Sequence, residues 1–186
     1  MPPKVRIQKE TITRAAYDLV RESGAKQLNA RNLAQAAGCS TQPIFSSYKS
    51  MDEVLADVKQ MARDEMNRML ANAKKGDLPM LGIGETYIRY AGLEPHLFEL
   101  LYCNGEQNEI FKMITAEGMI RAVSLDGGIS ESYAEELLRN FFFYCHGIAV
   151  SRANQSVDAL PAAGELKGVL KDFYKSYRKL YKKREE

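Results

Sequence analysis

The chain has 186 residues, of which 45% are hydrophobic and 27% charged, and this composition excludes a disordered protein. Residues 1–49 hold eight basic and three acidic side chains, residues 50–166 hold ten and eighteen, and residues 167–186 hold eight and three. The net charge of +2 therefore conceals a basic N-terminal block on an acidic body. The apolar runs are too short to cross a bilayer and residues 1–6 do not resemble a secretion signal, which predicts a soluble, cytoplasmic protein with no membrane partner.

Apolar side chains recur at helical spacing in the first half of the chain, beginning with Ile12, Ala16 and Val20. This spacing predicts helices over residues 7–23, 29–37, 41–47 and 50–76. Residues suited to helix ends support these limits: Gly24, Asn29, Gly38, Ser40 with Pro43 in the first turn, Ser50 with Glu53 as a capping box, and Gly76.

The second half of the chain predicts five more helices, over 79–91, 95–103, 107–124, 130–155 and 162–183. Proline or serine precedes or opens four of them, at Pro79, Pro95, Ser130 and Pro161. No run alternates apolar and polar residues for long enough to require a strand. The sequence therefore predicts an all-α protein of about nine helices, with a three-helix domain over 1–49 and a larger helical domain over 50–186.

The two short helices around Gly38-Cys39-Ser40 have the proportions of a helix-turn-helix, in which glycine permits the turn. The second of them is small enough to enter a DNA major groove. Its outward residues are short and polar, namely Thr41, Gln42, Ser46 and Ser47. An ordinary helical hairpin has the same turn, so the turn alone does not indicate DNA binding. The polar face of the second helix and the basic N-terminal block are the features that favour binding to nucleic acid.

A longer pattern extends on both sides of this turn. It comprises Ala15-Ala16 with Leu19, Gly24, Leu33-Ala34, Ala37-Gly38, Ser40, Ile44-Phe45, Tyr48, Ser50, Asp52-Glu53 and Val54-Leu55. With these residues the first 55 positions resemble the DNA-binding domain of the tetracycline-repressor (TetR) family of bacterial transcription regulators. Residues 87–102 and 144–150 are more weakly similar to segments of the regulatory domains of that family.

The resemblance implies roles for individual residues. Thr41 and Gln42 would face base edges, Gln42 with paired hydrogen bonds to adenine, and Pro43 would touch a thymine methyl group. Backbone phosphates would be held by Tyr48, Lys49 and the region of Asn29 and Arg31. Ile44 and Phe45 would lie mostly in the core. The sequence departs from the family pattern at Phe45, Ser47 and Met51, and each departure removes a phosphate contact.

The resemblance also implies a pocket for a small hydrophobic effector in the body, with close packing and no cavity as the alternative. The candidate lining is Met61, Met66, Tyr87, Tyr90, Phe98, Tyr102, Phe111, Met113 and Tyr144. It further implies a homodimer in which helices 130–155 and 162–183 pair with their copies, and a two-fold dimer reads palindromic DNA. Phe142, Val150 and Phe173 are the candidate interface residues.

The sequence contains no motif that indicates an enzyme, a metal site or a cofactor. Its three cysteines are widely spaced, and no metal-ligand spacing accompanies His96 or His146. The sequence therefore favours a ligand-responsive regulator, most simply a repressor of transcription, that binds double-stranded operator DNA. Two alternatives stay open: a DNA-binding dimer of this fold without a small-molecule ligand, and a helical interaction protein that no longer binds DNA.

Overall fold

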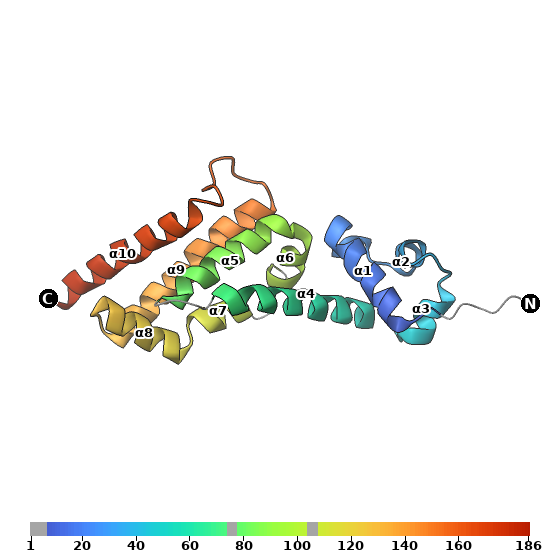
Figure 1. Cartoon of the computed structure of the whole chain (residues 1–186), viewed down its shortest axis with the longest axis horizontal. Coiled ribbons are helices and arrows are strands. Elements are labelled where there is room, and N and C mark those ends of the chain that lie inside the picture. The colour runs from blue at the N-terminus through green and yellow to red at the C-terminus, as the bar shows by residue number, and fades with distance from the viewer. Residues whose placement is uncertain (1–6, 74–77, 104–107) are drawn as a thin grey trace, which may run out of the picture.

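The computed structural model describes residues 7–73, 78–103 and 108–186. Within these ranges the protein consists of ten α-helices and one short 3₁₀-helix, with no strand (Figure 1). The helices are α1 (Lys9–Ser23), η1 (Ala25–Gln27), α2 (Ala30–Ala36), α3 (Gln42–Ser47), α4 (Met51–Ala73), α5 (Pro79–Leu93), α6 (Pro95–Tyr102), α7 (Glu109–Ile114), α8 (Glu117–Gly127), α9 (Glu131–Ala153) and α10 (Leu166–Glu185). The predicted all-α class is confirmed.

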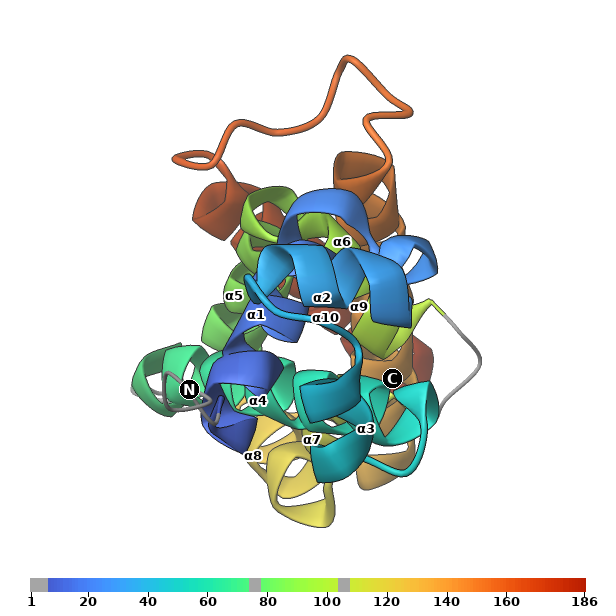
Figure 2. The same cartoon turned by 90° about the vertical axis from the view of Figure 1, so that its right-hand side faces the viewer.

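The three N-terminal helices form a small domain at one end of an elongated molecule (Figures 1 and 2). α1 contacts both α2 and α3, and its buried residues Ile12, Ala16 and Val20 follow the predicted helical spacing. α1 ends at Gly24, whose φ of +83° favours glycine. Residues 7–49 of the basic N-terminal block therefore form a packed three-helix unit.

α4 connects this unit to the body. It begins where predicted, with Ser50 Oγ accepting the N–H of Glu53 at 3.3 Å. It buries one residue per turn, at Val54, Val58, Ala62, Met66 and Leu70. The first part of this stripe packs on α1 and the later part on α5 and α6, so a single helix belongs to both parts of the molecule. The predicted end at Gly76 lies outside the described residues.

The body is centred on α5 and α9, which pack against each other and are surrounded by α4, α6, α7, α8 and α10. The two central helices approach closely at Gly84 of α5. A Cβ atom there would lie 2.8 Å from Cys145 Sγ and 2.9 Å from the Phe141 ring. The absence of a side chain at Gly84 therefore sets the distance between α5 and α9.

Several helix limits differ from the predicted ones, and three of the differences concern the number of helices, the start of α10 and the cap of α3. The single helix predicted over 107–124 is two, because both the N–H and the hydroxyl of Thr115 bond to the Phe111 carbonyl and Ala116 is extended. α10 begins at Leu166 rather than at residue 162. Thr41, not Ser40, precedes α3, and it makes no side-chain cap.

Candidate nucleic-acid interface and the helical body

α2 and α3 form a helix-turn-helix whose turn is fixed by local interactions. Asn29 Oδ1 accepts the N–H of Asn32 at 2.9 Å and caps α2, as predicted. Gly38 has a φ of +64°, in the left-handed region that glycine adopts without strain. The N–H of Cys39 then bonds back to the Ala34 carbonyl at 2.9 Å and closes the turn.

α3 buries one side and exposes the other. Ile44 is fully buried in the small domain, whereas Thr41, Gln42 and Ser46 are exposed. Pro43 and Ser47 are half-buried beside them. The structure thus brings five of the predicted DNA-contacting residues together on one short helix or directly before it.

The prediction that Phe45 lies mostly in the core is wrong, because 54% of its surface is exposed. α3 has only six residues, so a single position, Ile44, points into the core before the chain turns inward again at Tyr48. Phe45 follows Ile44 by about 100° around the helix and lies on the solvent side.

Tyr48 was predicted to hold a backbone phosphate, and the structure contradicts this role. The side chain is only 3% exposed, and its hydroxyl donates to Asp57 Oδ2 at 2.9 Å and is hydrogen-bonded with Thr13. Burial raises the pKa of Tyr48 above its ordinary value. Lys9 lies 4.5 Å from the ring centre and bonds to the same Asp57, so Tyr48 joins α1, α3 and α4 rather than facing solvent.

The other predicted phosphate-binding residues lie at the surface, at the start of α2 and after the end of α3. Lys49 is exposed directly after α3, with its backbone N–H bonded to Glu53 Oε2 at 2.8 Å. Arg31 is exposed in the first turn of α2. Asn29 is exposed too, but its side chain is engaged in capping. Lys49, two residues after the end of α3, and Arg31, in the first turn of α2, are therefore the exposed basic side chains among the predicted phosphate-binding residues.

Within the body, several of the predicted pocket residues form an aromatic cluster around Tyr87. Its ring lies 5.2 Å from that of Phe98 and 5.1 Å from that of Tyr102, measured between ring centres. The Tyr87 hydroxyl is hydrogen-bonded to His146 Nδ1 at 2.8 Å and accepts Asn108 Nδ2 at 3.0 Å. Burial raises the pKa of Tyr87 and lowers that of His146, so both are neutral near pH 7.

The remaining candidates for the pocket lie in different surroundings. Met66 and Tyr90 are fully buried, and no partner for the Tyr90 hydroxyl occurs among the described residues. Met61 lines a surface depression between α1 and α4, and Tyr144 stacks on Phe173 on the outer side of α9. Phe111 contacts Phe142, and Met113 is half-buried against the core. The predicted lining is therefore only partly one cluster.

The three candidate interface residues are not equivalent. Phe142 is 5% exposed and stacks on His146 inside the cluster, which contradicts its role in contacting a partner. Val150 and Phe173 are partly exposed. Sequence reasoning missed the partners of Phe173, an aromatic row that runs from Tyr144 through Phe173 to Tyr177, with ring centres 4.7 Å and 4.3 Å apart.

Polar side chains connect the small domain to the body, and the sequence analysis did not single them out. Arg21 of α1 makes a two-pronged ion pair with Glu94, with Arg21 Nε donating to Glu94 Oε2 at 2.7 Å. Glu94 lies between α5 and α6 and is 8% exposed. Nearby, the Tyr17 hydroxyl donates to Glu65 of α4. Such long-range pairs leave no local signal in a single sequence.

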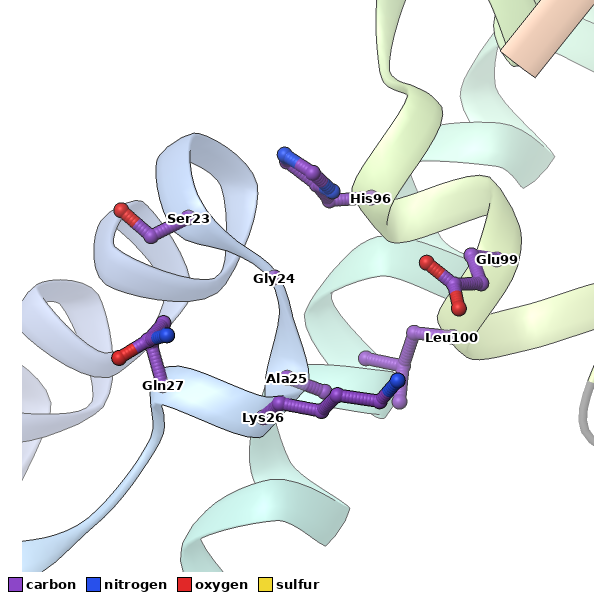
Figure 3. A pocket seen from close by; sticks show the side chains of 8 residues that line it. All are labelled: Ser23, Gly24, Ala25, Lys26, Gln27, His96, Glu99 and Leu100. Carbon is purple, nitrogen blue, oxygen red and sulfur yellow. The ribbon is translucent and has the colours of Figure 1, made fainter. Parts of the chain in front are cut away.

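A pocket of about 300 Å³ lies at this junction (Figure 3). Ser23, Gly24, Ala25, Lys26 and Gln27 line one side, and His96, Glu99 and Leu100 of α6 line the other. A Cβ atom on Gly24 would lie 3.4 Å from His96 Nδ1, so the end of α1 and the start of α6 are nearly in contact.

The described part of the chain offers no group of three or more His, Cys, Asp and Glu side chains arranged to hold a metal ion. None of its helices is both long enough and apolar enough to cross a membrane.

These features define a class of protein: an all-α chain in which a helix-turn-helix domain is joined by a long helix to a larger helical body. A TetR-like transcriptional regulator from Rhodococcus sp. RHA1 has this fold, with a TM-score of 0.65 and 16% sequence identity, covering 94% of this chain and 96% of that one. No protein-family model matches the chain, and no curated protein matches it significantly. The comparison confirms the TetR-like fold that the sequence resemblance predicted.

Proposed function

We propose that the protein is a regulator of transcription that binds double-stranded operator DNA with α3 in the major groove. The observation that carries this proposal is the exposed polar side of α3, where Thr41, Gln42 and Ser46 face solvent while Ile44 is buried. Short polar side chains on a helix of this size suit hydrogen bonds to base edges. Arg31 and Lys49 are exposed in the same three-helix domain and would supply charge for phosphates.

We propose that the regulator acts as a homodimer through α9 and α10. The aromatic row of Tyr144, Phe173 and Tyr177 is incompletely covered within one chain, and Leu180 beside it on α10 is 45% exposed. A second copy placed by a two-fold axis would bury this face against itself. Two α3 helices related by that axis would read a palindrome.

We propose that a small hydrophobic effector enters the region of Tyr87, Phe98 and Tyr102. The hydrogen bonds of the Tyr87 hydroxyl with His146 and Asn108 give this apolar region a polar centre, which suits a ligand with one polar group. In this proposal the ligand favours an arrangement of α6 that shifts α1 through the Arg21–Glu94 ion pair. The ligand binds this shifted arrangement more tightly than the DNA-binding arrangement, so ligand binding lowers the affinity for DNA. The regulator is then a repressor that its effector releases from DNA.

One observation favours a second candidate, a DNA-binding protein of this fold that takes no small molecule. Tyr87, Tyr90 and Phe98 are fully buried in the chain as it stands. An effector would therefore have to displace packed aromatic side chains. A thermal-shift screen of apolar compounds distinguishes the two candidates, because a ligand that binds the folded state raises the midpoint of unfolding.

DNA binding is tested by fluorescence anisotropy with the DNA upstream of the protein's own gene and with random duplexes, over a series of salt concentrations. Saturable binding at two protomers per site with a steep salt dependence is the expected result. Gln42→Ala should cost about 1–3 kcal/mol and relax specificity at one base pair. Lys49→Ala should weaken binding to every sequence and reduce the salt slope. No binding to any duplex at low salt contradicts the proposal and favours a helical interaction protein.

A further inference from the structure

The side chain of Phe45 is the unexpected feature of α3. It is 54% exposed, while the neighbouring Ile44 is fully buried. A phenylalanine ring offers no hydrogen-bonding group, so this exposure brings no compensating contact with water. The helix therefore carries one large apolar group on the side that is otherwise polar.

The position of Phe45 within the helix indicates what it faces. Gln42 precedes it by three residues, Thr41 precedes it by four, and both are exposed. Residues at these spacings lie on one face of a helix. Phe45 thus stands in the same row as the proposed base-reading residues and in the middle of α3. Phosphates are more easily reached by Lys49, which lies beyond the end of the helix.

The floor of the major groove offers an apolar side chain one distinctive partner. Guanine, cytosine and adenine present hydrogen-bond donors and acceptors there, whereas thymine also presents a C5-methyl group. A phenylalanine set among polar base-reading side chains can bury its surface against that methyl group. Opposite any other base it leaves polar groups without partners, which lowers affinity.

We propose that Phe45 is a specificity-determining residue that selects a thymine in each half-site by contact with its methyl group. This inference rests on the proposed binding of duplex DNA. It assigns the thymine contact to Phe45 rather than to Pro43, which is half-buried at the start of α3.

The test uses the full chain and a duplex obtained by selection from a random-sequence library. Each thymine of the selected duplex is replaced in turn by deoxyuridine, which removes only the methyl group and keeps every hydrogen bond. At one position, loss of the methyl should weaken binding about fourfold per half-site, from the value of roughly 0.8 kcal/mol for one buried methyl-sized group. Replacement in both half-sites should weaken it by about fifteenfold on the same basis.

Variants of the protein locate the side chain responsible. Phe45→Ala should bind the thymine and deoxyuridine duplexes equally, because the partner of the methyl group is gone. Ser46→Ala, the exposed neighbour, and Pro43→Ala should keep the preference for thymine. Circular dichroism during urea unfolding checks that Phe45→Ala, a change at an exposed side chain, leaves the fold intact.

The outcomes separate this inference from the function on which it rests. A wild-type protein that prefers no duplex sequence overturns both. Sequence-specific binding that is insensitive to deoxyuridine at every position overturns the role of Phe45 alone. The same follows if the penalty for deoxyuridine persists in Phe45→Ala or disappears in Pro43→Ala.

Discussion

Replacing Arg21 with alanine should weaken the connection between the small domain and the body. Arg21 lies near the end of α1, and its guanidinium bonds to both oxygens of Glu94, which sits between α5 and α6. In Arg21→Ala the Glu94 carboxylate, whose side chain is 10% exposed in the intact pair, loses its partner. A buried carboxylate without a partner disfavours the folded state.

The size of the effect follows from the burial of the two side chains. Breaking a buried ion pair by removing one partner costs about 3–5 kcal/mol, and a surface pair contributes about 0.2–1 kcal/mol. Arg21 is 49% exposed and Glu94 10%, which places this pair between the two cases. We expect Arg21→Ala to lower the free energy of unfolding by about 1–2 kcal/mol, or the melting temperature by roughly 3–6 °C.

Urea unfolding followed by circular dichroism measures this loss in a double-mutant cycle. Glu94→Gln removes the charge and keeps the shape, so in that background Arg21→Ala should cost much less. Glu22→Ala, at the exposed charged residue next to Arg21 in the same helix, is the control and should have little effect. If the two mutations are additive to within about 0.3 kcal/mol, the ion pair does not hold the junction together and the reasoning fails.

Three further predictions follow from side chains in the body. Burial lowers the pKa of His146, so between that pKa and the ordinary value of about 6.5 the unfolded chain binds more protons than the folded chain. The free energy of unfolding should therefore fall as the pH drops below about 6.5. Urea unfolding across pH measures this fall, which should be smaller in His146→Phe. Gly84→Ala should lower the unfolding free energy by about 1–3 kcal/mol in the same assay, because its Cβ would meet Cys145 and Phe141, while Gly118→Ala, where the space is open, should be neutral or stabilising. Leu180→Asp should shift the proposed dimer toward monomer in sedimentation velocity, and Lys182→Asp on another side of α10 should not; equal association of both variants would exclude this face.

Much of the fold was predictable because its signals are local. Helical spacing located the helices, and Asn29 and Ser130 cap the ones that they were predicted to begin. The predicted helix 107–124 has no proline near Thr115, so the sequence gives no signal for the break there. The break lies at the extended Ala116 and follows a threonine whose hydroxyl donates to the Phe111 carbonyl four residues earlier. Local sequence patterns therefore predict well that a segment is helical, but they predict where the helix ends only if a capping residue is present.

The candidate site was harder to predict because its details depend on neighbours distant in sequence. Tyr48 resembles a surface phosphate ligand until Thr13 and Asp57 are seen to hold its hydroxyl. The spacing of Phe45 from Gln42 already placed both on one face, so its exposure was accessible to helical reasoning. The Arg21–Glu94 pair joins positions 73 residues apart, and only the folded chain reveals it.

α1 is the element through which the body can influence the proposed DNA contact. It packs on α2 and α3 within the small domain and on α4 and α6 outside it. In the proposed mechanism, a shift of α6 that moves Glu94 would act on Arg21, and the packing of α1 on α3 would carry that shift to the recognition helix. In a two-fold dimer both recognition helices must meet the groove at one fixed spacing. In the proposed dimer, a small rotation of each α1 would change the distance between the two recognition helices, and the DNA affinity would then respond to an event in the body that never touches the DNA.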